Sequence, residues 1–123
     1  MNATTIPLRL VSESNAHEHW RSRQKRAKGQ RATVAMVASV ALTRPALPCV
    51  IRITRIAPKA LDKNNIDGAC KHVVDGLADW LGIDDRDPRV TYLCEQERGA
   101  PKTYAVRVEV IPSAVVRTEV VSV

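Results

Sequence analysis

The sequence predicts an α+β domain of the wider α/β class, with a mixed β-sheet and two main helices in the order β-α-β-α-β-β. Three observations predict this class. Alternating apolar residues predict short strands, two longer segments with apolar residues at helical spacing predict helices, and a turn with glycine and proline predicts a closing hairpin. The 123 residues suffice for one hydrophobic core and are too few for two domains. We therefore expect one domain over residues 1–111, with residues 112–123 as an edge strand or a flexible tail.

The first half of the chain predicts a strand followed by a long basic helix. Apolar residues at every second position over residues 6–11 are typical of a short, half-buried strand. Ser14 or Asn15 is a suitable cap for a helix that runs to about Leu42 and ends before Pro45. Small apolar residues gather on one side of this helix, and Arg and Lys gather on the other. We expect the apolar side to be buried and the basic side to face solvent.

The second half of the chain predicts a strand, a helix and a hairpin. Residues 50–56 are rich in β-branched side chains and lie between two prolines, which favours a strand. Residues 64–81 carry apolar side chains at helical spacing, and Gly82 is a suitable residue to end that helix. Residues 90–95 and 104–110 alternate apolar and polar side chains on either side of the glycine- and proline-containing turn.

The composition argues against a membrane-spanning, secreted or zinc-binding protein. The longest apolar run, residues 32–42, is about half of the ~20 residues that a membrane-spanning helix needs. The first residues lack the order of a secretory signal, so the expected compartment is the cytoplasm. Cys49, Cys70 and Cys94 are odd in number, widely spaced and next to apolar residues. We expect them to be buried, reduced thiols.

The charges are segregated along the chain. Residues 19–61 contain ten Lys or Arg and no Asp or Glu, whereas residues 62–97 contain nine acids against four bases. A basic segment attracts a polyanion and releases its counterions, while clustered acids repel one and need a separate explanation. A basic surface beside an acidic metal site would account for both segments.

The basic helix is the candidate nucleic-acid interface. Six of its bases fall within eleven residues, and Trp20 adds a ring on which a base can stack. His17 and His19 lack a third metal-binding neighbour and are more typical of capping or surface residues. The alternative is a solvated helix face. With two lysines near the acidic segment, the candidate DNA-binding residues are Arg21, Arg23, Lys25, Arg26, Lys28, Arg31, Lys59 and Lys63.

The acidic segment is the candidate metal site. Cleavage of a phosphodiester by Mg²⁺ needs carboxylates that converge on the ion. Asp62 precedes the helix of residues 64–81, and Asp84 and Asp85 follow it, so they meet only if the helix ends bend or the loop folds back. Asp67, Lys71 and Asp75, at spacings of four, share one helix face. The lysine is suited to contact a scissile phosphate or an attacking water, and the alternative is a pair of surface salt bridges.

The same segment resembles a known enzyme family. The stretch LDKNNIDGACKHVVDGLADWLGIDDRDPRV, preceded by SNAHEHWRSRQKRAK, resembles the RusA-like Holliday junction resolvases, especially phage and prophage members, over roughly residues 6–111. That family carries a DxDNL motif, a helical lysine with an aspartate four residues later, and a DD pair after the helix. The resemblance implies a homodimeric, Mg²⁺-dependent endonuclease of branched DNA in recombination and repair, in a bacterial or phage-infected cell, with Mn²⁺ able to replace Mg²⁺.

The family roles carry over by position. Asp62 stands at the first acid of DxDNL, with Asn65 and Ile66 at its N and L. The helical lysine and aspartate correspond to Lys71 and Asp75, and the DD pair corresponds to Asp84 and Asp85, of which the second is the metal ligand. The implied catalytic residues are Asp62, Asn64, Lys71 and Asp85, and the implied metal ligands are Asp62, Asn64 and Asp85. Asp67, one turn further along the same helix face, is a further candidate ligand that could substitute for the missing acid.

One position departs from the family motif. Asn64 stands where DxDNL has its second acid, and an amide oxygen binds Mg²⁺ without supplying negative charge. Reduced cleavage is the expectation. Asp67 compensating, a naturally weak or inactive homologue, and a deliberate substitution that traps uncut DNA are all open explanations. A non-catalytic DNA-binding module that uses the basic helix alone is the second hypothesis, and an RNA- or protein-binding domain is the third.

Overall fold

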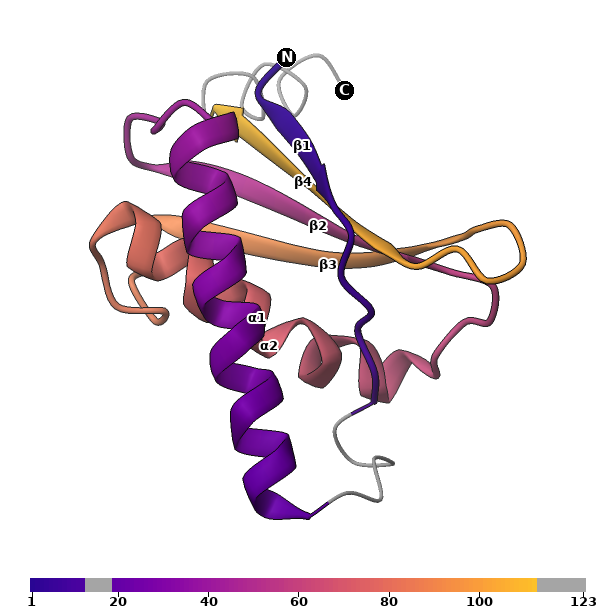
Figure 1. Ribbon diagram of the computed structural model, residues 1–123. Coiled ribbons are helices and arrows are strands. Elements are labelled where there is room, and N and C mark those ends of the chain that lie inside the picture. The colour runs from indigo at the N-terminus through magenta and orange to yellow at the C-terminus, as the bar shows by residue number, and fades with distance from the viewer. Residues whose placement is uncertain (13–18, 113–123) are drawn as a thin grey trace.

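A four-stranded sheet carries two helices on one of its faces in the computed structural model, which describes residues 1–12 and 19–112 (Figure 1). The predicted fold class and element order are confirmed. The elements in chain order are β1 (Ala3–Ile6), α1 (Trp20–Ala41), β2 (Cys49–Ala57), α2 (Lys63–Leu81), β3 (Val90–Arg98) and β4 (Ala105–Pro112). The sheet order is β1-β4-β2-β3. The predicted edge strand or tail at the end of the chain falls almost wholly on residues 113–123, which lie outside the described residues.

The sheet is mixed because its strands are joined in two different ways. β2 and β3 run parallel, with Cys49 opposite Val90 and Ala57 opposite Arg98. β4 pairs antiparallel with both β1 and β2. A parallel connection must carry the chain back along the sheet, and α2 does this between β2 and β3. The two ends of α2 therefore lie at opposite ends of these strands.

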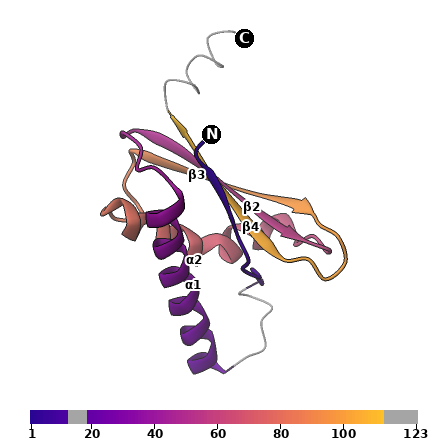
Figure 2. The same ribbon diagram turned by 45° about the horizontal axis from the view of Figure 1, so that its top comes forward.

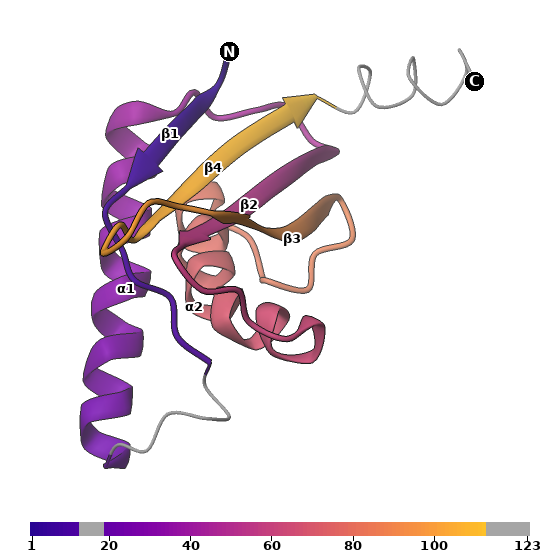
Figure 3. The same ribbon diagram turned by 90° about the vertical axis from the view of Figure 1, so that its right-hand side faces the viewer.

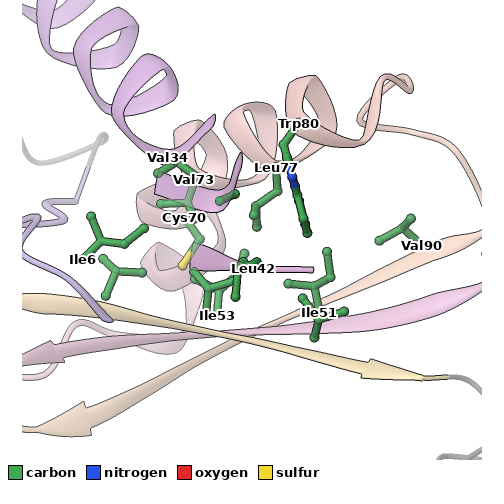
Figure 4. Close-up of a cluster of buried hydrophobic side chains, with 14 of the residues drawn as sticks. Ile6, Val34, Leu42, Ile51, Ile53, Cys70, Val73, Leu77, Trp80 and Val90 are labelled. Carbon is green, nitrogen blue, oxygen red and sulfur yellow. The ribbon is translucent and has the colours of Figure 1, made fainter. Parts of the chain in front are cut away.

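The hydrophobic core lies between the sheet and the two helices (Figure 4). Alternate residues of β2 point toward the helices, so Ile51 and Ile53 are fully buried. Cys70, Val73 and Leu77 of α2 pack against them at helical spacing. The opposite face of the sheet carries ion pairs, such as the one between Arg107 and Glu97, together with apolar side chains such as those of Val50 and Ile111. In Figure 2, α1 extends below the sheet and α2 passes behind the strands. The apolar pattern of residues 64–81 is thus the packing face of α2.

The first strand begins earlier than the sequence predicts, and the first helix begins later. β1 ends at Ile6, where the predicted strand starts, because Pro7 has no N–H for the sheet and Leu8 bonds back to the Ile6 carbonyl. The alternation still marks burial, since Ile6 and Leu10 are each 1% exposed. α1 begins at Trp20, and the Nδ1 atom of His19 caps it by accepting the Arg21 N–H at 3.2 Å. Thus the predicted start was wrong, and Ser14, Asn15 and His17 lie outside the described residues.

α1 and α2 cross at a glycine. A Cβ atom at Gly76 would lie 2.6 Å from the Arg31 carbonyl oxygen and 2.8 Å from the Val34 Cβ. Only a hydrogen at this position allows the two helix backbones to approach so closely. At the end of α2, Gly82 adopts a left-handed φ of 70° and caps the helix, as its position in the sequence predicts.

Two further expectations concern the membrane and the cysteines. Among residues 1–12 and 19–112, no helix has the length and apolar character needed to cross a membrane. All three cysteines are free, and Cys49 and Cys70 are buried while Cys94 is partly exposed. Burial raises the pKa of the Cys49 thiol. The prediction of unpaired thiols is therefore confirmed, with Cys94 less buried than expected.

Candidate metal and nucleic-acid surfaces

The N-terminal end of α2 carries the first candidate metal ligands. Asp62 is the residue before the helix, is exposed, and makes no capping hydrogen bond with its carboxylate. Asn64 and Asp67 are also exposed in the first turns of the helix. A capping aspartate usually accepts a backbone N–H of the first turn. The carboxylate of Asp62 is instead left available for a cation.

The other end of α2 carries the second group of acids. The Asp84 carboxylate accepts the Arg86 backbone N–H at 2.8 Å, and this bond holds the pKa of Asp84 below its usual range. Asp85 is exposed beside it. Burial, together with nearby negative charges that include Asp85 and Asp87, raises the pKa of Tyr92 to about 12. These acids therefore lie around the start of β3 and not around Asp62.

The two groups of acids are too far apart in one protomer to share a metal ion. α2 is a continuous helix of 19 residues, and such a helix is about 28 Å long. Neither a bend at its ends nor a returning loop brings Asp85 back to Asp62, because the loop leads on to β3 beside the start of β2. Within the described ranges, no cluster of three or more His, Cys, Asp or Glu side chains could hold a metal ion. The residues of one protomer do not fit a Mg²⁺ site that contains both Asp62 and Asp85.

The middle of α2 carries the candidate lysine. The Lys71 ammonium lies 4.0 Å from the carboxylate of Asp75, one turn further along. Lys71 follows Asp62 by nine positions, a rise of about 13 Å along the helix axis. A contact from this lysine to a phosphate held at Asp62 of the same protomer would span that rise. The contact between Lys71 and Asp75 is the kind of surface salt bridge that the spacing also allows, and the catalytic role of Lys71 stays a prediction.

The basic side of α1 faces solvent along its first half. Arg21, Arg23, Lys25 and Lys28 are exposed, and Arg26 is partly buried. Arg31 differs, since its guanidinium is bound in a bidentate pair to Asp79 of α2, at 2.6 and 2.7 Å. Its charge is thus compensated within the protein. Trp20 is 57% exposed at the tip of the helix, where its ring is open to a stacking partner.

The Arg31–Asp79 pair predicts a small, pH-dependent contribution to stability. Arg31 lowers the pKa of Asp79, so the pair stabilises the fold above the unfolded value of about 3.9, and this contribution is lost as the pH falls through the lower folded-state pKa. Both side chains are more than 40% exposed, so we expect Asp79→Asn to cost only about 0.5 kcal/mol at neutral pH. Denaturant unfolding of both proteins at several pH values measures this cost. A difference that persists at a pH below the folded-state pKa would contradict it.

A hollow beside Asp62 contains residues that the sequence analysis did not single out. Its volume is about 560 Å³, and Arg9, Arg55 and Tyr104 line it together with two predicted site residues, Lys59 and Asp62. Arg55 belongs to the buried face of β2, the same face as Ile51 and Ile53. A charged residue at an inward position of a buried strand is the feature of the sequence that could have revealed it.

A larger hollow lies away from all of the candidate residues. It has a volume of about 1130 Å³ on the outer face of the sheet, and Leu47, Val50, Leu93 and Ile111 are among its apolar lining. The acids of α2 and the basic residues of α1 do not line it. No protein-family model matches the chain, and no curated protein matches it either.

Proposed function

We propose that the protein is a Mg²⁺-dependent endonuclease for Holliday junctions or other branched DNA, of the RusA-like kind, and that it acts as a homodimer. The observation that carries the proposal is the position of two exposed acids, Asp62 and Asp85, at the two ends of one continuous helix. Both stand at metal-ligand positions of the family motif. The basic exposed side of α1 supports it, because such a surface attracts the DNA backbone.

A second copy of the chain would bring the two distant acids together in one site. A two-fold axis across the middle of α2 turns the helix end for end, so that Asp62 of one protomer meets the partner's Asp85. The same operation makes a second, identical site. Lys71 and Asp75, which lie near the middle of the helix, have opposite charges and are suited to pair across such an axis. The dimer would then hold two sites related by the symmetry of a four-way junction.

The ligand chemistry of such a shared site suits Mg²⁺. Carboxylate and amide oxygens from Asp62, Asn64 and the partner's Asp85 are the kind of ligands that this ion takes. The bound ion would supply Lewis-acid stabilisation of charge on the phosphate and a more acidic water. Asn64 brings oxygen without charge, so we expect weak cleavage from the sequence as it stands.

A non-catalytic DNA-binding module is the second candidate. The amide at Asn64 and the distance between the two groups of acids in one protomer favour it. In that case the basic side of α1 binds DNA, and the acids of α2 are merely solvated. An RNA- or protein-binding domain differs from both candidates in its preferred ligand.

A competition and cleavage experiment tests the proposal. Binding of a four-way junction, a linear DNA duplex and a matched RNA is compared at one salt concentration, since affinities at different salt concentrations cannot be compared. We expect the junction to bind most tightly, and to be nicked when Mg²⁺ or Mn²⁺ is added. Junction binding without nicking, in this protein and in Asn64→Asp, supports the non-catalytic module. A preference for RNA or for no nucleic acid contradicts both candidates.

A further inference from the structure

The hollow beside Asp62 is formed by three segments that are distant in the sequence. It lies among the residues that follow β1, the end of β2 with the start of α2, and Tyr104 just before β4. Figures 1 and 3 show the chain after β1 descending toward the start of α2. Its volume of about 560 Å³ lies within the ~300–1,000 Å³ range of ligand pockets. It is therefore large enough for part of a nucleotide.

Arg55 is a buried cation with no acidic partner among residues 1–12 and 19–112. Only 7% of the residue is exposed, and burial lowers the pKa of its guanidinium. Its Nε donates to the Leu10 carbonyl at 3.0 Å and its Nη1 donates to the Lys59 carbonyl at 2.9 Å. Its Nη2 has no hydrogen-bond partner in the described part of the chain. The two carbonyls hold the guanidinium in place at the wall of the hollow.

Two more cations line the same hollow. The Arg9 guanidinium lies 4.3 Å from the centre of the Tyr104 ring, and this contact fixes its position. Lys59 is exposed at the rim. Among residues 1–12 and 19–112, neither of them forms an ion pair with a carboxylate, whereas Arg31, Arg52, Arg89 and Arg107 all do.

The charge balance of the hollow is positive. Arg9, Arg55 and Lys59 supply three positive charges, and Asp62 is the single acid among the lining residues that belong to the described part of the chain. A buried cation without a counter-ion is costly, and an anion that enters from outside removes that cost. Arginine side chains suit phosphate oxygens best, because their N–H groups donate in a planar fork.

We propose that this hollow is a phosphate-binding subsite, in which Arg55, Arg9 and Lys59 hold a phosphodiester group of a DNA strand that lies next to Asp62. The inference rests on the proposed function, since a DNA strand is the ligand. Arg55 donates from Nη2, Arg9 and Lys59 supply charge at the rim, and the Tyr104 hydroxyl is a further donor. The subsite fixes the strand so that a neighbouring phosphate lies at the carboxylate of Asp62.

Nuclear magnetic resonance of the full chain tests the subsite directly. The probes are inorganic phosphate and, separately, a short single-stranded DNA without a terminal phosphate. We expect both probes to shift the Arg55 Nε–H signal and the backbone signals of Lys59 and Tyr104, and to saturate. Phosphate shifts that spread evenly over the basic side of α1, or that spare Arg55, would overturn the proposal. A response to inorganic phosphate alone would overturn the assignment to a DNA strand.

Charge-changing variants give the expected size of the effect. Arg9→Gln and Lys59→Gln should each weaken phosphate binding about fivefold, and Asp62→Asn should strengthen it about fivefold, since two charges at ~4 Å in water interact by about 1 kcal/mol. Arg86→Gln is the matched control: Arg86 is exposed and lies outside the hollow, so the affinity should not change. If Asp62→Asn leaves the affinity unchanged or weakens it, the assignment is wrong.

Arg55→Gln should abolish saturable phosphate binding. Because Arg55 also holds two carbonyls, circular dichroism must first show that this variant folds; if it does not, the three other variants decide. Cleavage assays separate this inference from the proposed function. Phosphate binding in the hollow without any cleavage of branched DNA contradicts the endonuclease and leaves the subsite standing. Cleavage that Arg9→Gln does not alter, together with absent phosphate binding, contradicts the subsite and leaves the endonuclease standing.

Discussion

Asn64→Asp is expected to raise the rate of Mg²⁺-dependent junction nicking on the order of 100-fold, which corresponds to about 2.7 kcal/mol of transition-state stabilisation. The substitution places a carboxylate two residues after Asp62, where the motif that this segment resembles has its second acid. Asn64 is exposed, so the new carboxylate needs no desolvation and should not disturb the fold. A second charged ligand strengthens Mg²⁺ binding and increases the acidity of the bound water. Nicking of a labelled junction under single-turnover conditions measures the change.

Gly68→Asp is the matched control for this substitution. It adds the same charge to the same helix at an exposed position that has no neighbouring atom within 4 Å and lies outside the hollow beside Asp62. A general effect of added negative charge on this surface would appear in both variants. We expect the gain in rate at position 64 alone. Equal gains in both variants, or none in Asn64→Asp, would contradict the assignment of Asn64 to the metal site.

Gly76→Ala is expected to have the largest effect on stability among the helix glycines, with a loss of about 2–3 kcal/mol. The added methyl group would lie 2.6 Å from the Arg31 carbonyl oxygen and 2.8 Å from the Val34 Cβ. The carbonyl oxygen belongs to the α1 backbone and the Val34 Cβ is bonded directly to it, so α1 and α2 must move apart. The core beneath the crossing would lose contacts as well, because Val34 is fully buried there.

Gly68→Ala is the control, because it lies in the same helix with no neighbouring atom within 4 Å. Alanine should stabilise this exposed position by about 0.5–1 kcal/mol, the usual difference in helix propensity. Guanidinium unfolding of both variants gives the comparison. Similar stabilities for the two variants would show that the close approach at Gly76 does not matter.

The order of elements could be predicted because the strong periodicities are local. α2 repeats apolar residues at helical spacing and ends at Gly82, so its bounds were predicted within one residue at its start and correctly at its end. β1 could not be placed in this way. Its pairing with β4 depends on residues a hundred or more positions away, and Pro7 ends that pairing where the alternation continues. The start of α1 was also wrong, because a histidine caps it in place of the usual polar residues.

The candidate site could be predicted only in part, because some of its residues come from segments that are distant in the sequence. The acids of α2 are visible in the sequence, and the helix length already indicates that Asp62 and Asp85 are far apart. The hollow beside Asp62 was missed because Arg9, Arg55 and Tyr104 come from three separate segments. Arg55 alone gave an indication, as a charge at an inward position of β2.

The central claim is that each catalytic site is shared between two protomers, and a defined heterodimer tests it most directly. Asp62→Asn and Asp85→Asn chains, each with its own affinity tag and each with Asn64→Asp, are co-expressed and purified through both tags. The homodimer of either variant should be inactive. A shared site predicts that the heterodimer nicks junctions at about half the rate of the parent, since one of its two sites then holds both acids and the other holds neither. A heterodimer as inactive as the two homodimers would contradict the claim.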